Sequence, residues 1–320
     1  MKGIDHDPAS WIACEFSGYS VSSDGVYGVE RLVRFASAER EMHMSLRRRL
    51  VVLIAAATLA VAMVLVQGCS GDSEAAPDNR EDVAAEPAST QEGDEMDFHL
   101  NYVEAGEGEP LILLHGNSEN WTYFYSQIGY FQDQYRVIAV DTRGHGGSPR
   151  GTAPFTLDQF ADDLAAFMDE QGIDEANILG FSDGANIALL FALDHPERVT
   201  RLVLNGANLS PEGLTEEISR EIDEAYQAAL AANDETSLEF LRLMVDEPHI
   251  DPSSLAALDM PVLVIAGTDD MIAEEHTRLI ADSIPGAQLT FVPGTHFIAA
   301  ENPGEFNAVV ADFLKSMPGN

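Results

Sequence analysis

The feature that most constrains this chain is the sequence Gly-Phe-Ser-Asp-Gly at residues 180–184. A short aliphatic run at 178–179 precedes it, and a helical pattern rich in small residues begins at Gly184. Glycines on both sides of a serine let the backbones of a strand and a helix approach each other around a strained turn. The segment therefore predicts a strand, a tight turn and a helix, with Ser182 at the turn and free helix N–H groups directed toward it.

Runs typical of strands and of helices alternate from residue 98 onward. Most of the strand candidates are short and continuously aliphatic, as expected for strands covered on both faces. They lie at 98–104, 111–114, 136–140, 177–181, 201–204, 262–266 and 288–292. The clearest helical run is 157–171, where Thr156 can cap the start and Gly172 follows the end. This alternation predicts an α/β fold with a mostly parallel, twisted sheet and helices on both faces.

The interval between the strand candidates at 201–204 and 262–266 is too long for a simple crossover. Two helical patterns, at about 217–232 and 236–245, occur within residues 209–259. Ligands of open α/β sheets bind at the carboxyl ends of the strands, so we expect this segment to form a small helical lid over that edge. The alternative is a pair of helices that only packs against the flank of the sheet.

The charge of the chain excludes one class of partner. The 320 residues include 54 acidic and 17 basic side chains, for a formal charge of −37, and the whole acidic excess follows residue 69. Such a surface repels phosphate backbones, so we expect no nucleic-acid partner. The histidines and cysteines show no metal-ligand spacing, and no glycine-rich dinucleotide motif follows a strand. We therefore expect neither a metal nor a cofactor.

The segment 44–69 is similar to a bacterial lipoprotein signal peptide. Three arginines at 47–49 precede an uncharged apolar run at 50–66, and the sequence Val-Gln-Gly-Cys ends at Cys69. This pattern predicts lipidation of Cys69, although Gln67 is unusual at its position. The alternative is an uncleaved membrane anchor. Either interpretation places the following residues outside the cytoplasmic membrane of a bacterium and tethered to it.

Two further segments are predicted from composition. Residues 1–43 precede the plausible start at Met44 and form either an overlong translation start or an N-terminal extension. Residues 70–96 are acidic and carry few large apolar side chains, which is typical of a disordered linker. The folded domain is therefore expected at 97–320.

Over residues 97–320 the chain resembles the enzymes of the α/β-hydrolase fold. The resemblance depends on short motifs that each follow a strand candidate, in the order Ser, Asp, His that this fold uses. The motifs are Leu113-Leu114-His115-Gly116-Asn117, Asp141-Thr142-Arg143-Gly144-His145-Gly146-Gly147-Ser148, the turn at Ser182, Gly267-Thr268-Asp269-Asp270 and Gly294-Thr295-His296-Phe297.

The resemblance assigns three catalytic roles. Ser182 is the expected nucleophile, because a hydroxyl attacks a carbonyl once a base removes its proton, and His296 is the expected base. Asp270 is expected to hold the imidazole tautomer, with its neighbour Asp269 as the alternative.

The resemblance also predicts an oxyanion hole formed by the backbone N–H groups of Asn117 and Asp183. The side chain of Asn117 could add a donor or serve only as a turn residue. With Asp183 after the serine, the turn resembles that of the biphenyl-hydrolase-like branch, which includes valacyclovir hydrolase. The resemblance implies a contact between the carboxylate of Asp183 and a substrate ammonium group. The alternative is a simple interaction between Asp183 and the helix dipole. His115 is expected to shape its loop, and the segment 143–148 to be a structural turn.

The implied activity is that of a carboxylesterase-like serine hydrolase, which cleaves a small ester, thioester or lactone through an acyl-enzyme. The same triad also supports a cofactor-free perhydrolase or haloperoxidase, or hydrolysis of a carbon–carbon bond in a diketone. A surface-tethered binding protein without catalysis is a further alternative, but no member of the triad is missing. Dehalogenases and epoxide hydrolases of this fold carry aspartate in place of Ser182 and are disfavoured.

Overall fold

A computed structural model describes residues 98–316 of the chain. The expected extension at 1–43, the lipoprotein-type segment at 44–69 with Cys69, and the linker at 70–96 all lie outside the described residues. No helix within 98–316 is both long and apolar enough to cross a membrane.

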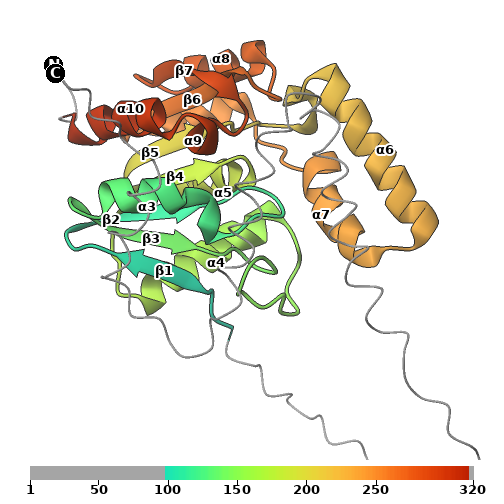
Figure 1. Ribbon diagram of the computed structural model, residues 1–320, viewed down its shortest axis with the longest axis horizontal. Coiled ribbons are helices and arrows are strands. Elements are labelled where there is room, and N and C mark those ends of the chain that lie inside the picture. Colours follow the sequence, from blue (N-terminus) through green and yellow to red (C-terminus); the bar gives the residue numbers. More distant parts are fainter. Residues whose placement is uncertain (1–97, 317–320) are drawn as a thin grey trace, which may run out of the picture. The chain divides into compact units, whose positions relative to one another are not determined.

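The described residues form a seven-stranded, mostly parallel sheet, as the alternation of strands and helices predicted (Figure 1). The strand order is β1-β3-β2-β4-β5-β6-β7, and only the edge strand β1 runs antiparallel to its neighbour β3. The strands are β1 (Tyr102–Ala105), β2 (Glu109–Leu114), β3 (Tyr135–Val140), β4 (Ala176–Phe181), β5 (Val199–Asn205), β6 (Val262–Asp269) and β7 (Gln288–Thr295).

Helices cover both faces of this sheet (Figure 1). One face is covered by α3 (Tyr125–Phe131), α9 (Ile298–Glu301) and α10 (Pro303–Lys315), and the other by α4 (Leu157–Glu170), α5 (Asp183–Asp194) and α8 (Glu274–Ser283). Short 3-10 turns complete the chain at η3 (Trp121–Phe124), η4 (Pro196–Arg198), η5 (Pro211–Gly213) and η6 (Pro252–Ala257). Successive side chains of a strand point to opposite faces, so the single strand β2 serves both cores. Leu111 and Leu113 pack toward α3 and α10, whereas Ile112 and Leu114 pack toward α4 and α5.

Two element boundaries can be compared directly with the sequence patterns. Helix α4 begins at Leu157 as predicted, and the side chain of Thr156 accepts a hydrogen bond from the N–H of Gln159. The first strand differs, because it begins only at Tyr102 instead of residue 98. Just before it, the backbone of Asn101 is bonded to the loop after β3, with its N–H donating to Ser148 Oγ and its carbonyl accepting from Asp141.

The long interval between β5 and β6 contains a helical hairpin, formed by α6 (Glu216–Ala232) and α7 (Glu235–Val245). Its helices pack on each other through a small apolar cluster of their own, which includes Ile222 and Leu238. Figure 1 shows the hairpin beside the sheet, past the carboxyl ends of the parallel strands. An ion pair between Arg150 and Glu239, at 2.7 Å, joins α7 to the loop after β3. The hairpin thus lies at the sheet edge where the motif-bearing loops emerge.

Candidate active site

Ser182 occupies a strained turn between β4 and α5. Its backbone has φ 54° and ψ −121°, a conformation that L-residues rarely adopt. The turn needs glycine on both sides, because a Cβ atom on Gly180 would collide with the carbonyl of Gly184, and one on Gly184 with the carbonyl of Leu114. The N–H of Ser182 donates to the carbonyl of Asn205 at 2.8 Å. The strand–turn–helix geometry predicted for residues 180–184 is therefore present.

His296 and Asp270 form a buried, hydrogen-bonded pair. The imidazole Nδ1–H donates to Asp270 Oδ1 at 2.6 Å, and both side chains are at most 5% exposed. Burial opposes ionisation of Asp270. The charge of His296 and hydrogen bonds from His296, Ile272 and Gly267 outweigh burial and hold the pKa of Asp270 below its usual value. Asp269 is exposed, and its side chain accepts from Thr268 Oγ1, so the structure brings Asp270 and not Asp269 to the histidine.

The ring of His296 lies in the immediate surroundings of Ser182. Its centroid is 4.8 Å from that of Phe181, and a Cβ atom on Gly206 would lie 2.7 Å from its Cε1. Phe181 precedes the serine, and Gly206 follows the residue that accepts the serine N–H. The imidazole Nε2 atom is buried and has no hydrogen-bond partner within residues 98–316. Catalytic hydrogen bonds often tighten only when substrate binds, so an unpaired Nε2 atom is compatible with a general base that takes up a proton.

The loop after β2 approaches the serine from another side. A Cβ atom on Gly116 would lie 3.1 Å from the Cβ of Ser182. His115 shapes this loop as expected, since its Nε2 accepts from the N–H of Thr142 at 3.1 Å and its Nδ1 donates to the carbonyl of Gly116 at 2.8 Å. Burial lowers the pKa of His115, which favours this neutral tautomer.

The backbone N–H groups of Asn117 and Asp183 remain available near Ser182. Neither donates to another residue in the described part of the chain. Two unpaired N–H groups, one from the loop after β2 and one at the start of α5, are the arrangement that stabilises a developing oxyanion.

The side chains of Asn117 and Asp183 are bonded to each other. The Nδ2 atom of Asn117 donates to Asp183 Oδ2 at 2.9 Å and to the carbonyl of Phe240, on α7 of the hairpin, at 3.0 Å. Both amide hydrogens of Asn117 are therefore engaged, and its side chain is not a third oxyanion donor. Burial raises the pKa of Asp183 to about 6, against the hydrogen bond from Asn117 and with help from the charge of Glu247. The residue as a whole is only 8% exposed.

Three side chains near the triad were not singled out from the sequence. They are Glu119, whose buried Oε2 atom has no hydrogen-bond partner in the described residues, and Tyr123 and Asn205, whose buried polar atoms interact with each other. Burial raises the pKa of Glu119 to about 7, although the N–H of Gly116 and the charge of His296 oppose this. The sequence offers one signal, and it concerns Glu119 alone, which is an acidic residue three positions after the loop glycine Gly116. That signal does not distinguish a surface carboxylate from a buried one.

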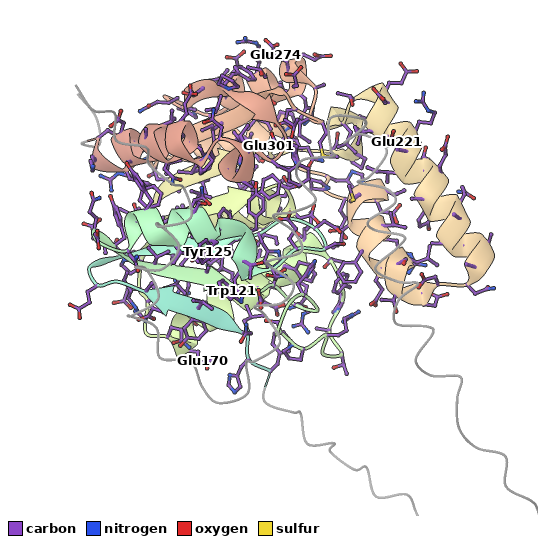
Figure 2. The ribbon with its side chains drawn as sticks, viewed as in Figure 1. Trp121, Tyr125, Glu170, Glu221, Glu274 and Glu301 are labelled. Carbon is purple, nitrogen blue, oxygen red and sulfur yellow. The ribbon has the colours of Figure 1, made fainter. Side chains whose placement is uncertain are left out.

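Other motif residues have structural roles. Arg143 forms a buried double hydrogen bond with Asp163, at 2.6 and 2.7 Å, as befits a structural turn. Glu301, labelled in Figure 2, holds the histidine loop by accepting from both the N–H and the hydroxyl of Thr295 at 2.9 Å. Across the part of the chain that the structure covers, no group of three or more potential ligand side chains could hold a metal ion.

Comparison with known proteins agrees with the observed fold. The alpha/beta hydrolase fold family matches residues 109–244. The 2-hydroxymuconate semialdehyde hydrolase of Pseudomonas sp. (strain CF600) is 30% identical over 256 residues, which cover 68% of this chain and 90% of that protein. The 3-oxoadipate enol-lactonase 2 of Acinetobacter baylyi is 28% identical over 253 residues, covering 69% of this chain and 94% of that protein.

A solved structure shows the same similarity. Est816, described as an N-acyl homoserine lactone degrading enzyme, is 26% identical to this chain with a TM-score of 0.58. The match covers 67% of this chain and 96% of that one. Each of these three matches therefore covers about two thirds of this chain and at least 90% of the similar protein.

Proposed function

Because the chain belongs to the alpha/beta hydrolase fold family, we propose that it is a serine hydrolase that cleaves a carboxylic ester, thioester or lactone through an acyl-enzyme. The observation that carries this proposal is the buried His296–Asp270 pair packed against the turn that holds Ser182. A strained serine beside a histidine with an unpaired Nε2 atom has the parts that nucleophilic catalysis requires.

The mechanism follows from the hydrogen bonds. Ser182 Oγ attacks the substrate carbonyl and gives its proton to His296 Nε2, while Asp270 holds the Nδ1 proton and stabilises the imidazolium. The oxyanion is bound by the N–H groups of Asn117 and Asp183. His296 then protonates the leaving oxygen or sulfur as the carbon–oxygen or carbon–sulfur bond breaks. A water molecule that gives its proton to His296 then attacks the acyl-enzyme in the same way. This step releases the acid product and frees Ser182.

Two names among the similar proteins, an enol-lactonase and an N-acyl homoserine lactone degrading enzyme, support a lactone as one candidate substrate. A lactone places its leaving oxygen on the same molecule as the acyl group, so ring opening gives a single hydroxy-acid product. Assays with simple lactones therefore belong beside those with open-chain esters.

A fluorophosphonate probe tests the nucleophile, because it transfers its phosphonyl group to an activated serine with loss of fluoride. The wild type is expected to react and Ser182→Ala is not. Ser126→Ala, which changes an exposed serine of α3, is the matched control and is expected to react like the wild type. Equal labelling of wild type and Ser182→Ala would refute the proposed nucleophile. A series of nitrophenyl esters of increasing acyl length then defines the preferred substrate.

Hydrolysis of a carbon–carbon bond in a diketone is the second candidate function. The similarity to a 2-hydroxymuconate semialdehyde hydrolase favours it. Because the same triad serves both reactions, the catalytic residues do not distinguish the two candidate functions. Rates measured on a diketone and on a nitrophenyl ester distinguish them. A diketone rate far above the ester rate would replace the first proposal with the second.

A substrate ammonium group is a further proposed contact, made with the carboxylate of Asp183. A buried carboxylate beside the nucleophile has a raised pKa, and a cation would supply the missing opposite charge. A valyl ester is then expected to be cleaved faster than its des-amino analogue, and Asp183→Asn to remove the difference. Equal rates on the two esters would eliminate this contact.

The membrane tether also stays a proposal. It is supported by the sequence of residues 44–69 alone and predicts lipidation at Cys69. Incorporation of labelled palmitate into the wild type but not into Cys69→Ser would support it. Incorporation into neither would leave an uncleaved anchor as the alternative.

A further inference from the structure

Glu119, Tyr123 and Asn205 form a polar cluster beside the catalytic residues. The side chains of Tyr123 and Asn205 interact with each other, whereas the buried Oε2 atom of Glu119 has no hydrogen-bond partner within 98–316. Buried polar atoms in folded proteins nearly always have partners, because leaving one unpaired is costly. An unpaired carboxylate oxygen beside an active site therefore requires a functional explanation.

Ring packing and backbone contacts connect this cluster to the triad. The ring of Tyr123 stacks on that of Phe181, with centroids 4.3 Å apart and planes 9° from parallel, and the same Phe181 ring contacts His296. The carbonyl of Asn205 accepts the N–H of Ser182, and its neighbour Gly206 touches the imidazole. The cluster therefore packs directly against the residues that hold the serine and the histidine.

The titratable groups of the cluster also interact electrostatically with the catalytic residues. The charge of Glu119 interacts with that of His296, and the Tyr123 hydroxyl interacts with Glu119, Asp270 and Glu301. Of the carboxylates near His296, Asp270 is bonded to Nδ1 and Asp183 is bonded to Asn117. The N–H of Glu119 donates to the carbonyl of Gly116 at 3.2 Å, which holds Glu119 in the loop that touches Ser182, and its buried Oε2 atom has no hydrogen-bond partner in the described residues.

We propose that Glu119 is a positioning residue that supplies a second negative charge to His296 and thereby stabilises the imidazolium formed when Ser182 gives up its proton. This inference rests on the proposed serine hydrolase function. Asp270 is bonded to the ring and fixes its tautomer, whereas Glu119 acts through space in a water-poor site, where charges interact more strongly than in water.

A carboxylate can have this effect only when it is ionised. Burial raises the pKa of Glu119 to about 7, so this carboxyl changes its charge near neutral pH. Asp270 and Asp183 also interact with the charge of His296, and the Tyr123 hydroxyl interacts with Glu119, Asp270 and Glu301. As the pH falls, Glu119 takes up a proton and its support of the imidazolium disappears. The protonation of Glu119 is then expected to contribute to the acid side of the activity profile.

The test compares Glu119→Gln with the wild type in two measurements over a range of pH: kcat/KM for a nitrophenyl ester and the rate of fluorophosphonate labelling. Loss of the charge is expected to reduce kcat/KM at alkaline pH on the order of tenfold, because the imidazolium formed in the reaction is less stable without it. The acid limb of the profile is expected to move to lower pH. Glu119→Asp, which keeps the charge, is expected to restore part of the rate.

Glu175→Gln is the matched control, because Glu175 is an exposed glutamate just before β4, at the other end of the strand that leads to Ser182. It is expected to behave like the wild type, and thermal unfolding verifies that both variants are folded. An unshifted acid limb with unchanged kcat/KM in Glu119→Gln would overturn the inference. A lower rate with an unshifted limb would also overturn it, since that result indicates a purely structural role. A wild type that neither reacts with the probe nor cleaves esters would instead refute the proposed function itself.

Discussion

Asp183 offers a direct test of how burial controls charge at this site. This residue is 8% exposed and lies in the first turn of α5, and its carboxylate accepts a hydrogen bond from Asn117. Its pKa rises from 3.8 to about 6 on folding, chiefly because of burial. The folded chain therefore binds this proton more tightly than the unfolded chain does. The resulting stabilisation is complete below the unfolded value and is lost as the pH rises through about 6.

Asp183→Asn replaces the carboxyl with a neutral group of the same shape. A difference of about 2 pKa units corresponds to roughly 3 kcal/mol, so the variant is expected to exceed the wild type by up to about that amount at pH 8. About half of the difference is expected to have disappeared at about pH 5, where the wild type is partly protonated. For a domain of this size, the gain corresponds to a Tm higher by roughly 6–12 °C at pH 8.

Urea denaturation at the two pH values, followed by circular dichroism, measures this difference. Asp158→Asn is the matched control, because Asp158 lies in the first turn of α4 but is exposed. Removing its charge is expected to cost about 0.3–1 kcal/mol through the helix dipole. If Asp183→Asn is instead less stable than the wild type at pH 8, the ionised carboxylate is a net stabiliser of α5, and the reasoning from burial is wrong.

Three further predictions concern neighbouring elements. Gly206→Ala is expected to slow fluorophosphonate labelling by about 100-fold in a folded protein, because its methyl group would displace the His296 ring. An unchanged labelling rate would contradict that packing. His145, whose pKa is lowered by burial to about 4, contributes stability above pH 6.5 that is lost as the pH falls through about 4. The unfolding free energy of His145→Phe, measured with urea, is therefore expected to vary less over this range, and an equal slope would refute the assignment. Arg150→Ala removes a half-exposed ion pair with Glu239, so we expect less than about 1 kcal/mol of destabilisation but faster proteolysis of the hairpin. An unchanged cleavage rate would argue against the ion pair as an anchor of the hairpin to the loop after β3.

Much of the fold was predictable because it depends on short-range patterns. The aliphatic runs that became β2, β4 and β6 are buried on both faces, and such runs are legible from a few consecutive residues. The turn at Ser182 was predictable for the same reason, since two glycines within five residues specify the close approach of β4 and α5. Thr156 likewise caps α4 through a bond to a residue only three positions away.

The arrangement of the site depended on contacts that no local pattern contains. Asp269 and Asp270 are adjacent and chemically identical, and only the path of the loop after β6 brings one of them to His296. Asn117 contacts Asp183 and Phe240, which lie 66 and 123 positions further along the chain.

The buried oxygen of Glu119 was equally invisible in a loop that reads as polar. Burial and distant pairing are created when the layers pack together, so the sequence by itself determined which residues could react. The tertiary structure decided which of them meet and in what charge state.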